Sequence, residues 1–240
     1  MHSGIRIGVV GDFNHQSKAH EAISRALASR PERPIEAVWI PTDEVKSGDL
    51  AEFDGIWCAP GMPYRSDEGA LQAIRHARLT RTPFLGTSAG FQYALLEYAR
   101  NTLGLSAAEH QKTSPKAIMP LISPLACALA GVRARVRFMD GSKIRSAYGA
   151  PESVEEYHCS FGLNGRYRRL IEGGDLCVSA IDDQQEIRGL ELDGHPFFAA
   201  TLFQPELRSL AEGGPPNPLV SAFVAACAER SRRAVSKAVG

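Results

Sequence analysis

The sequence of 240 residues has no net charge and no long hydrophobic run. Its 27 Lys and Arg residues balance 27 Asp and Glu residues, so no global basic field favours nucleic acid or an anionic membrane as a partner. No apolar run approaches the ~20 residues of a membrane span, and the N-terminus lacks the apolar core of a signal peptide. These absences predict a soluble, cytoplasmic protein.

Cysteine is also scarce, and the five cysteines form no CxxC pair. An odd number of unpaired cysteines indicates reduced thiols in an intracellular protein and no zinc site. There is no P-loop motif, no internal repeat and no low-complexity stretch, and the only linker-like run spans residues 213–218. We therefore expect one domain over residues 1–240 with no metal and no cofactor.

The first half of the chain alternates short apolar runs with longer amphipathic stretches. This pattern predicts strands at 5–10, 37–40, 55–59 and 84–87 and helices at 15–29, 69–79 and 90–101. The hydrophobic residues of the first strand are too continuous for a sheet with one solvated face, which predicts a place at the sheet centre. The second half is more irregular, with strands expected at 117–120, 133–139, 155–161, 177–181, 187–192 and 198–203, and a closing helix from 219 to about 233.

A G-x-S-x-G motif lies between the fourth strand and the helix that follows it, at residues 86–90. Small residues two positions either side of Ser88 permit the sharp turn of a nucleophile elbow, which places the hydroxyl at a helix N-terminus. Backbone N–H groups there stabilise developing negative charge. Tight strand-to-helix connections with a serine cap have the same pattern, so the motif alone leaves both interpretations open.

Four segments resemble the class I glutamine amidotransferases, and in particular the amidotransferase domain of CTP synthase. They are PFLGTSAGFQYALLEYARNTLG (83–104), DGIWCAPGMPYRSDEGALQAIRHAR (54–78), ELDGHPFFAATLFQPELRS (191–209) and NPLVSAFVAA (217–226). The resemblance covers nearly the whole chain. It implies a three-layer α/β sandwich with a flavodoxin-like, mostly parallel sheet.

The sequence departs from that family at two catalytic positions. The resemblance implies a cysteine nucleophile where this chain has Ser88, and a histidine base where it has Gln204; only the orienting Glu206 is kept. An alcohol needs an adjacent base to lose its proton, and a carboxamide cannot provide one. We therefore expect ordinary glutaminase turnover to be absent. An engineered change of cysteine to serine would explain position 88 but not Gln204.

Substrate recognition is also expected to differ from that of the family. By alignment, the arginine that holds the glutamine carboxylate falls at Ser160, and an acidic residue that holds the amino group falls at Lys112. A pocket that binds free glutamine would keep both the arginine for the carboxylate and the acidic residue for the amino group. The expected substrate-binding residues are Gly61, Arg65, Ala89, Gly90, Gln92, Lys112, Cys159 and Ser160.

A serine hydrolase would still require a histidine base. His158 is the candidate that could reach Ser88, although His158 and Cys159 would point to opposite faces of a strand. His110 is expected at a pocket rim and His195 in a structural turn, whereas His2, His15, His20 and His76 are expected to be solvated. Cys159 is a second candidate nucleophile, with a small buried thiol as the simpler interpretation.

Two functions follow from these residues. The first is an enzyme that acts on a small-molecule amide or related carbonyl compound through Ser88, with Glu206 orienting a base or the substrate. The second is a catalytically silent amidotransferase-like module that binds a metabolite or a protein partner. The synthetase domain of CTP synthase is not expected in this sequence, which leaves open a separate synthetase partner or a homo-oligomer.

Overall fold

The computed structural model describes residues 4–28, 34–46, 48–210 and 216–239. Within them, one large mixed sheet has the strand order β2-β1-β3-β4-β10-β9-β8-β6-β5, with β7 paired to β6. The strands are β1 (Ile5–Val10), β2 (Ile35–Ile40), β3 (Gly55–Cys58), β4 (Phe84–Thr87), β5 (Ala108–His110), β6 (Met119–Phe138), β7 (Glu152–Leu163), β8 (Leu176–Ile181), β9 (Ile187–Leu192) and β10 (Phe198–Thr201).

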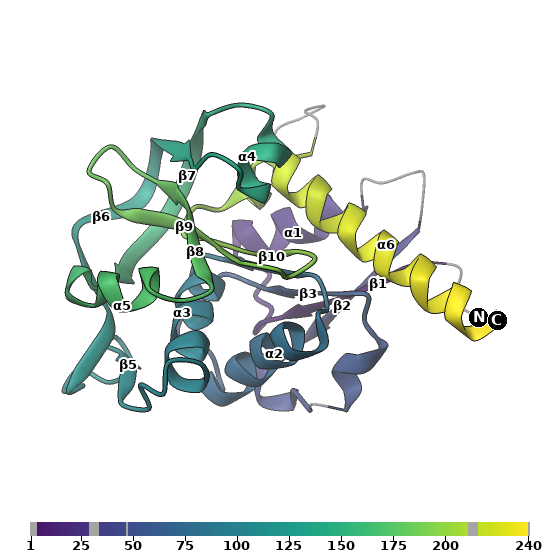
Figure 1. Cartoon of the computed structure of the whole chain (residues 1–240), viewed down its shortest axis with the longest axis horizontal. Coiled ribbons are helices and arrows are strands. Elements are labelled where there is room, and N and C mark those ends of the chain that lie inside the picture. Colours follow the sequence, from purple (N-terminus) through teal and green to yellow (C-terminus); the bar gives the residue numbers. More distant parts are fainter. Residues whose placement is uncertain (1–3, 29–33, 47, 211–215, 240) are drawn as a thin grey trace.

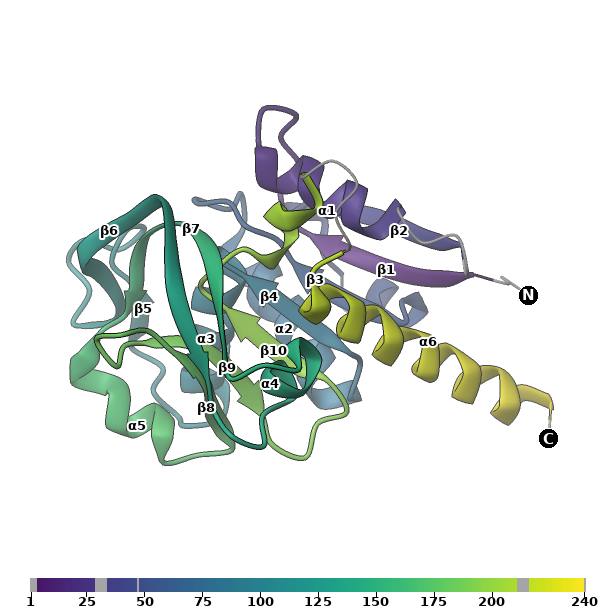
Figure 2. The same ribbon diagram turned by 90° about the horizontal axis from the view of Figure 1, so that it is seen from above.

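Helices cover both faces of the sheet and complete a three-layer α/β sandwich, as predicted (Figure 1). The α-helices are α1 (Lys18–Ala28), α2 (Asp67–Thr80), α3 (Ala89–Asn101), α4 (Lys143–Tyr148), α5 (Arg168–Glu172) and α6 (Pro218–Val239). Four short 3-10 helices span Thr42–Glu44, Asp49–Glu52, Gly165–Tyr167 and Pro205–Leu210. Helix α6 runs along the face formed by β1 and β3, and α2 and α3 lie on the opposite face (Figures 1 and 2).

The half of the sheet that carries the Ser88 turn is parallel. Strands β2, β1, β3, β4 and β10 are paired in parallel, and β9 is antiparallel to β10. Strand β1 is buried on both faces, which agrees with its continuous hydrophobic sequence, although it lies second from the edge and not at the centre. All parallel strands point the same way, so their carboxyl ends meet at one edge of the sheet.

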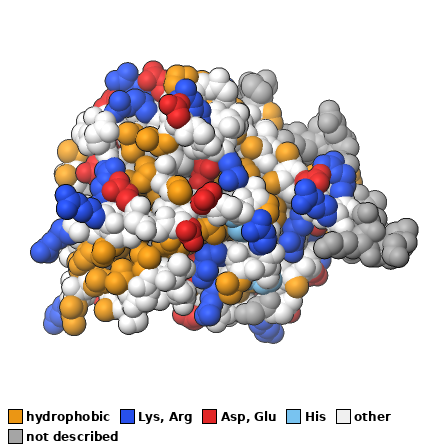
Figure 3. Space-filling model, in the orientation of Figure 1, with side chains coloured by type: hydrophobic (Ala, Val, Ile, Leu, Met, Phe, Trp, Pro, Cys, Tyr) orange, Lys and Arg blue, Asp and Glu red, His pale blue; other side chains and the backbone are white. Residues whose placement is uncertain are grey.

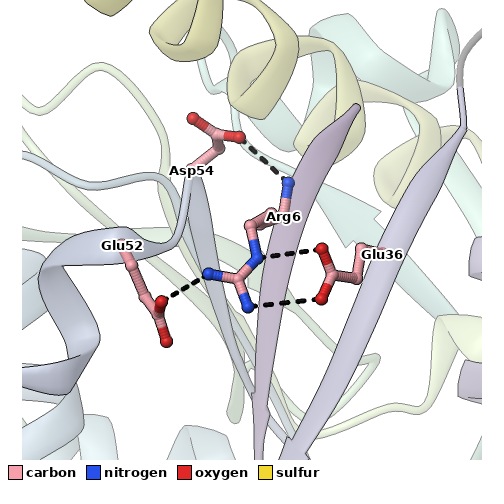
Figure 4. Close-up of polar contacts among 4 residues, drawn as sticks. All are labelled: Arg6, Glu36, Glu52 and Asp54. Atoms are coloured by element: carbon pink, nitrogen blue, oxygen red, sulfur yellow. Dashed lines mark hydrogen bonds and ion pairs between the residues drawn. The ribbon is translucent and has the colours of Figure 1, made fainter. Parts of the chain in front are cut away.

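The opposite edge of these strands is tied by charged side chains. Arg6 on β1 donates to both carboxylate oxygens of Glu36 on β2 and also pairs with Glu52 (Figure 4). The carboxylate of Asp54 accepts from the backbone N–H of Arg6 at 2.9 Å. A two-pronged guanidinium contact fixes geometry better than a single ion pair does. This cluster aligns the first strands far from the end that carries Ser88.

The irregular second half contains the largest errors of the sequence-based assignment. The predicted strands at 117–120 and 133–139 are parts of one strand, β6, that is 20 residues long. Its middle is rich in Ala, which has weak strand propensity, and long-range antiparallel pairing with β7 makes it a strand. Strand β5 and helices α4 and α5 were not predicted, and each is at most six residues long.

Candidate functional site

A cavity of about 620 Å³ lies at the carboxyl ends of the parallel strands. Open α/β sheets bind ligands at this edge, where the loops that follow the strands come together. Its lining residues are Gln16, Ser17, Lys18, Ala19, Pro60, Gly61, Met62, Ser88, Ala89, Gln92, His110, Lys112, His158, Cys159, Ser160, Phe161, Gln204 and Leu207. The cavity therefore joins segments from across the whole chain around Ser88.

Ser88 lies in a strained backbone conformation. Its φ is 54° and its ψ is −103°, a region that non-glycine residues rarely adopt. A Cβ atom at Gly90 would lie 2.2 Å from the carbonyl oxygen of Cys58, and one at Gly86 would lie 2.8 Å from the carbonyl oxygen of Gly90. Both glycines are thus required sterically, which explains the spacing of the motif.

Two backbone segments of the cavity lining, at Ala89 and at Gly61, were predicted to form an oxyanion hole. Ala89 is the first residue of α3, and the helix itself offers no acceptor for its N–H. Gly61 follows β3 with a φ of 130°, and the carbonyl of the preceding residue, Pro60, accepts a 2.7 Å hydrogen bond from His20. Because the peptide is planar and trans, the N–H of Gly61 points away from His20.

His20 is a residue of this site that the sequence analysis missed. It was expected to be solvated, but it is buried and its Nδ1 accepts from the N–H of Asn14 at 3.0 Å. The other ring nitrogen therefore carries the proton and donates to Pro60, and burial lowers the pKa of the ring. The available signal was its spacing from Ile23 and Leu27, which places all three on the buried face of α1.

Cys159, and not His158, contacts the serine of the motif. The Sγ of Cys159 lies 2.9 Å from the Oγ of Ser88 and also donates to the carbonyl of Leu202 at 3.3 Å. His158 bonds to Glu156 at 2.8 Å and is half-exposed, although its side chain also lines the cavity. Neighbouring strand residues point to opposite faces, so only one of them can meet Ser88. Burial raises the pKa of the Cys159 thiol to about 11, which leaves it protonated at neutral pH.

Gln204 and Glu206 form a buried polar cluster behind Ser88. Gln204 Nε2 lies 3.4 Å from Glu206 Oε1, which also accepts from the Thr87 hydroxyl at 3.3 Å. Trp57 Nε1 donates to the same hydroxyl at 3.2 Å. Burial raises the pKa of Glu206 to about 8, and Gln204 Oε1 and Glu206 Oε2 have no hydrogen-bond partner among the described residues. The cluster thus places the Gln204 carboxamide, which cannot accept a proton at neutral pH, beside the carboxyl group of Glu206.

A second polar group lies on the far side of the cavity. His110 Nε2 donates to Gln92 Oε1 at 3.0 Å, and Gln92 Nε2 donates to the carbonyl of Phe161 at 2.8 Å. The N–H of Lys112 donates to His110 Nδ1, which fixes the tautomer of the ring, and burial lowers the pKa of His110 to about 4. His110 is thus a neutral, buried wall of the cavity. It was expected only at the rim.

The remaining predicted residues divide between the cavity and its surroundings. Lys112 reaches across the opening and donates to the carbonyl of Met62 at 3.3 Å, and Ser160 is exposed in the cavity lining. Gly90 lies in the Ser88 turn, close to the carbonyl oxygen of Cys58. Arg65 does not line this cavity: its side chain lies 3.8 Å from Asp43. His195 is buried and bonded to the backbone of Ala77 and Phe197, as expected for a structural turn.

Two kinds of structure are absent from the described residues. They contain no group of three or more His, Cys, Asp or Glu side chains that could hold a metal ion. None of the helices traced in the described ranges is long and apolar enough to cross a membrane. All five cysteines have free thiols, with Cys58, Cys159 and Cys227 buried.

Comparison with known proteins supports the family that the sequence motifs resemble. Residues 11–216 match the model of the glutamine amidotransferase class-I family. The chain belongs to this family. The match includes the Ser88 turn, the Gly61 loop and the segment that carries Gln204 and Glu206.

Curated relatives of the amidotransferase include CTP synthases. The CTP synthase of Staphylococcus carnosus is 32% identical over 92% of this chain, and that of Pyrobaculum calidifontis is 32% identical over 95%. The chain spans 44% and 46% of the length of these two relatives. The alignments thus relate it to slightly less than half of each CTP synthase.

Solved structures confirm the fold of the amidotransferase. The glutaminase domain of Trypanosoma brucei CTPS, with bound acivicin, superimposes with a TM-score of 0.82 over 94% of each chain at 21% identity. A glutamine amidotransferase from Thermotoga maritima gives a TM-score of 0.58 at 12% identity, over 96% of this chain and 86% of that one. At these identities the likeness shows the fold alone, so the chemistry has to be argued from the site.

Proposed function

We propose that this amidotransferase acts on a small-molecule amide or related carbonyl compound other than free glutamine, through a nucleophile elbow at Ser88 and with an altered catalytic triad. The observation that carries the proposal is the conformation of the elbow. Ser88 keeps a strained backbone and an Oγ atom at the cavity, while Gln204 stands beside Glu206 where a base would be required. Strain of this kind costs about 1–3 kcal/mol and persists most often at functional sites.

The residues suggest how such a site would handle a carbonyl group. Ser88 Oγ would attack the carbonyl carbon, and the negative charge on the carbonyl oxygen would face the N–H of Ala89 at the start of α3. The Gly61 loop, held by His20, would complete the oxyanion hole. Neither the Gln204 amide nor the Cys159 thiol can accept the serine proton at neutral pH, so a basic group of the substrate or a water molecule would have to do so.

One observation favours the second function, a catalytically silent module that binds a metabolite. Among the described residues, the hydrogen-bond partner of the Ser88 hydroxyl is the Cys159 thiol, and no histidine nitrogen or carboxylate bonds to it. A serine without a base is a weak nucleophile. In this alternative the cavity keeps the ability to bind a ligand and the reaction is lost.

Covalent labelling separates the two functions. A fluorophosphonate probe should label Ser88, with the adduct located by peptide mass spectrometry, and Ser88→Ala should abolish labelling. A panel of small amides should release ammonia in the presence of the native protein. If the probe does not react and no amide releases ammonia, the silent module is the correct function.

A double variant tests whether the pocket accepts glutamine. Ser88→Cys with Gln204→His supplies both a thiol and a base, and Ser88→Cys alone is the matched control. We expect no ammonia release from glutamine with either variant, because recognition has changed as well as catalysis. Glutaminase activity in the double variant alone would show that the pocket still binds glutamine, and would contradict the proposed substrate class.

A further inference from the structure

The cavity at Ser88 has positively charged lysines and no acidic lining residue. Lys18 and Lys112 contribute to the lining, and no Asp or Glu does so in the described parts of the chain. Both lysines are exposed, and neither forms an ion pair with a carboxylate among the described residues. Because lysine is protonated at neutral pH, these two side chains give the cavity a positive charge.

The nearest carboxylates are engaged with other partners. Glu156 bonds to His158, and Glu109 accepts from the hydroxyl of Ser114 at 3.3 Å. Asp12 accepts from the N–H and the hydroxyl of Thr42 at 2.9 and 3.1 Å. Glu206 is fully buried behind Gln204, and its raised pKa keeps it largely protonated at pH 7. None of these carboxylates lines the cavity, so none is placed to contact a ligand ammonium directly.

The backbone carbonyls that could bind an ammonium group already accept hydrogen bonds. The carbonyl of Met62 accepts from Lys112 Nζ at 3.3 Å, so a cationic side chain already occupies that position. The carbonyl of Pro60 accepts from His20 at 2.7 Å, and that of Phe161 accepts from Gln92 at 2.8 Å. A ligand ammonium would therefore meet the Lys112 ammonium at the Met62 carbonyl, and repulsion between the like charges disfavours amino acids as ligands.

We propose that the ligand of this cavity is a short carboxylate that has a terminal carboxamide or related carbonyl group and lacks a free amino group. The carboxylate would lie near Lys112 and Lys18, and the carbonyl would lie at Ser88 and the N–H of Ala89. Gln92 and the neutral His110 form the polar wall between these ends. This inference rests on the proposed function, because it names the substrate class for the same site.

A matched pair of compounds tests the inference directly. Glutarate monoamide differs from L-glutamine only by the absence of the α-amino group. Isothermal titration of the native protein should give a dissociation constant at least tenfold lower for glutarate monoamide than for L-glutamine. Equal or tighter binding of L-glutamine would overturn the inference, and so would a failure of both compounds to bind.

Reversing the charge of Lys112 tests whether this residue causes the preference for glutarate monoamide. Lys112→Glu should remove most of the preference for glutarate monoamide. Lys116→Glu, an exposed lysine four residues away that does not line the cavity, is the matched control and should leave the preference unchanged. Equal effects of the two variants would show that only the overall charge matters. Circular dichroism should confirm that both variants are folded.

The outcomes distinguish this inference from the proposed function. If glutarate monoamide and glutarate both bind but no amide is hydrolysed and Ser88 is not labelled, the carboxylate specificity is correct and the enzymatic proposal is wrong. If a neutral amide is hydrolysed while neither carboxylate binds, the enzymatic proposal is correct and the carboxylate specificity is wrong.

Discussion

Glu206 lies in a buried cluster, and the binding of one proton to its carboxylate changes the charge of that cluster. Its carboxyl group contacts Thr87 and Gln204, and its Oε2 has no partner in the part of the chain that the structure describes. Burial disfavours the charged form, which raises its pKa from 4.5 to about 8. The folded protein therefore holds this proton between about pH 4.5 and 8, a range in which the unfolded chain releases it.

Glu206→Gln should reduce the pH dependence of stability. The contribution of the protonated carboxyl is fully present below about pH 4.5 and is lost as the pH rises toward 8, with a slope of about 1.4 kcal/mol per pH unit. Urea unfolding at pH 5, 6, 7 and 8 measures the slope. Glu155 and Glu191, whose pKa values are also raised by burial, remain in both proteins, so the difference isolates Glu206. Identical slopes would show that Glu206 is ionised in the folded protein.

At the scale of single residues, the sequence predicted the sharp turn at Ser88 because Gly86 and Gly90 are needed for local steric reasons. It could not predict which side chain meets Ser88. Cys159 comes from a strand 71 residues away, and its contact depends on which face of β7 turns toward the cavity. The role of His20 was missed for the same reason, since Pro60 reaches it only after folding.

Helices α2 and α3 are joined by a buried ion pair. Arg78 donates to both carboxylate oxygens of Glu97 at 2.9 and 2.7 Å, and Glu97 is fully buried. Glu97 lies on the helix that begins directly after Ser88, so the pair holds α3 against α2. A two-pronged contact of this kind fixes the relative position of its two partners, and removing one partner leaves the other charge buried and uncompensated.

Arg78→Ala should destabilise the protein by about 3–5 kcal/mol, because it leaves the buried Glu97 carboxylate without its charged partner and with only the Asn101 amide donating to it, at 3.3 Å. Chemical denaturation measures the change in the free energy of unfolding. Arg232→Ala removes an exposed arginine that pairs with Glu229 three residues earlier, and should cost less than about 1 kcal/mol. The double variant Arg78→Met with Glu97→Leu should recover much of the loss. If Arg78→Ala is as stable as the native protein, this account of the ion pair is wrong.

At the scale of elements, the sequence identified those that are long and periodic. Strands β1, β3 and β4 and helices α2 and α3 were predicted to within two residues, because each is almost wholly buried or clearly amphipathic. Helix α1 begins three residues later than predicted, since Asn14 and Ser17 form a turn before it. The long strand β6 was missed because its partner strand, and not its own composition, makes it extended.

The core of the whole molecule joins α6 to the parallel half of the sheet. Phe223 on α6 packs against Trp57 on β3 and against Phe197, with ring centroids 5.9 Å apart in each pair. All three side chains are buried. On the surface, basic and acidic side chains are interspersed over the face in Figure 3, as the balanced composition predicts.

Phe223→Ala should lower the free energy of unfolding by about 3–5 kcal/mol through lost burial and a cavity. Phe223 does not line the cavity at Ser88, so ligand affinity measured well below the melting temperature should be unchanged. Thermal denaturation and isothermal titration on the same preparation measure the two effects. A large loss of affinity in the folded variant would show that the core under α6 also controls the site.

Local periodicity and motif spacing were enough to predict the α/β class and the tight turn at Ser88, because neighbouring residues encode them. The resemblance of four segments to a known family predicted the family. Folding was needed to establish which groups face Ser88, that His20 holds the Gly61 loop, and that the cavity lining contains lysines and, among the described residues, no carboxylate. These facts depend on side chains from several separated segments of the chain. Their distances and burial, which set their charges and their hydrogen bonds, exist only once the chain has folded.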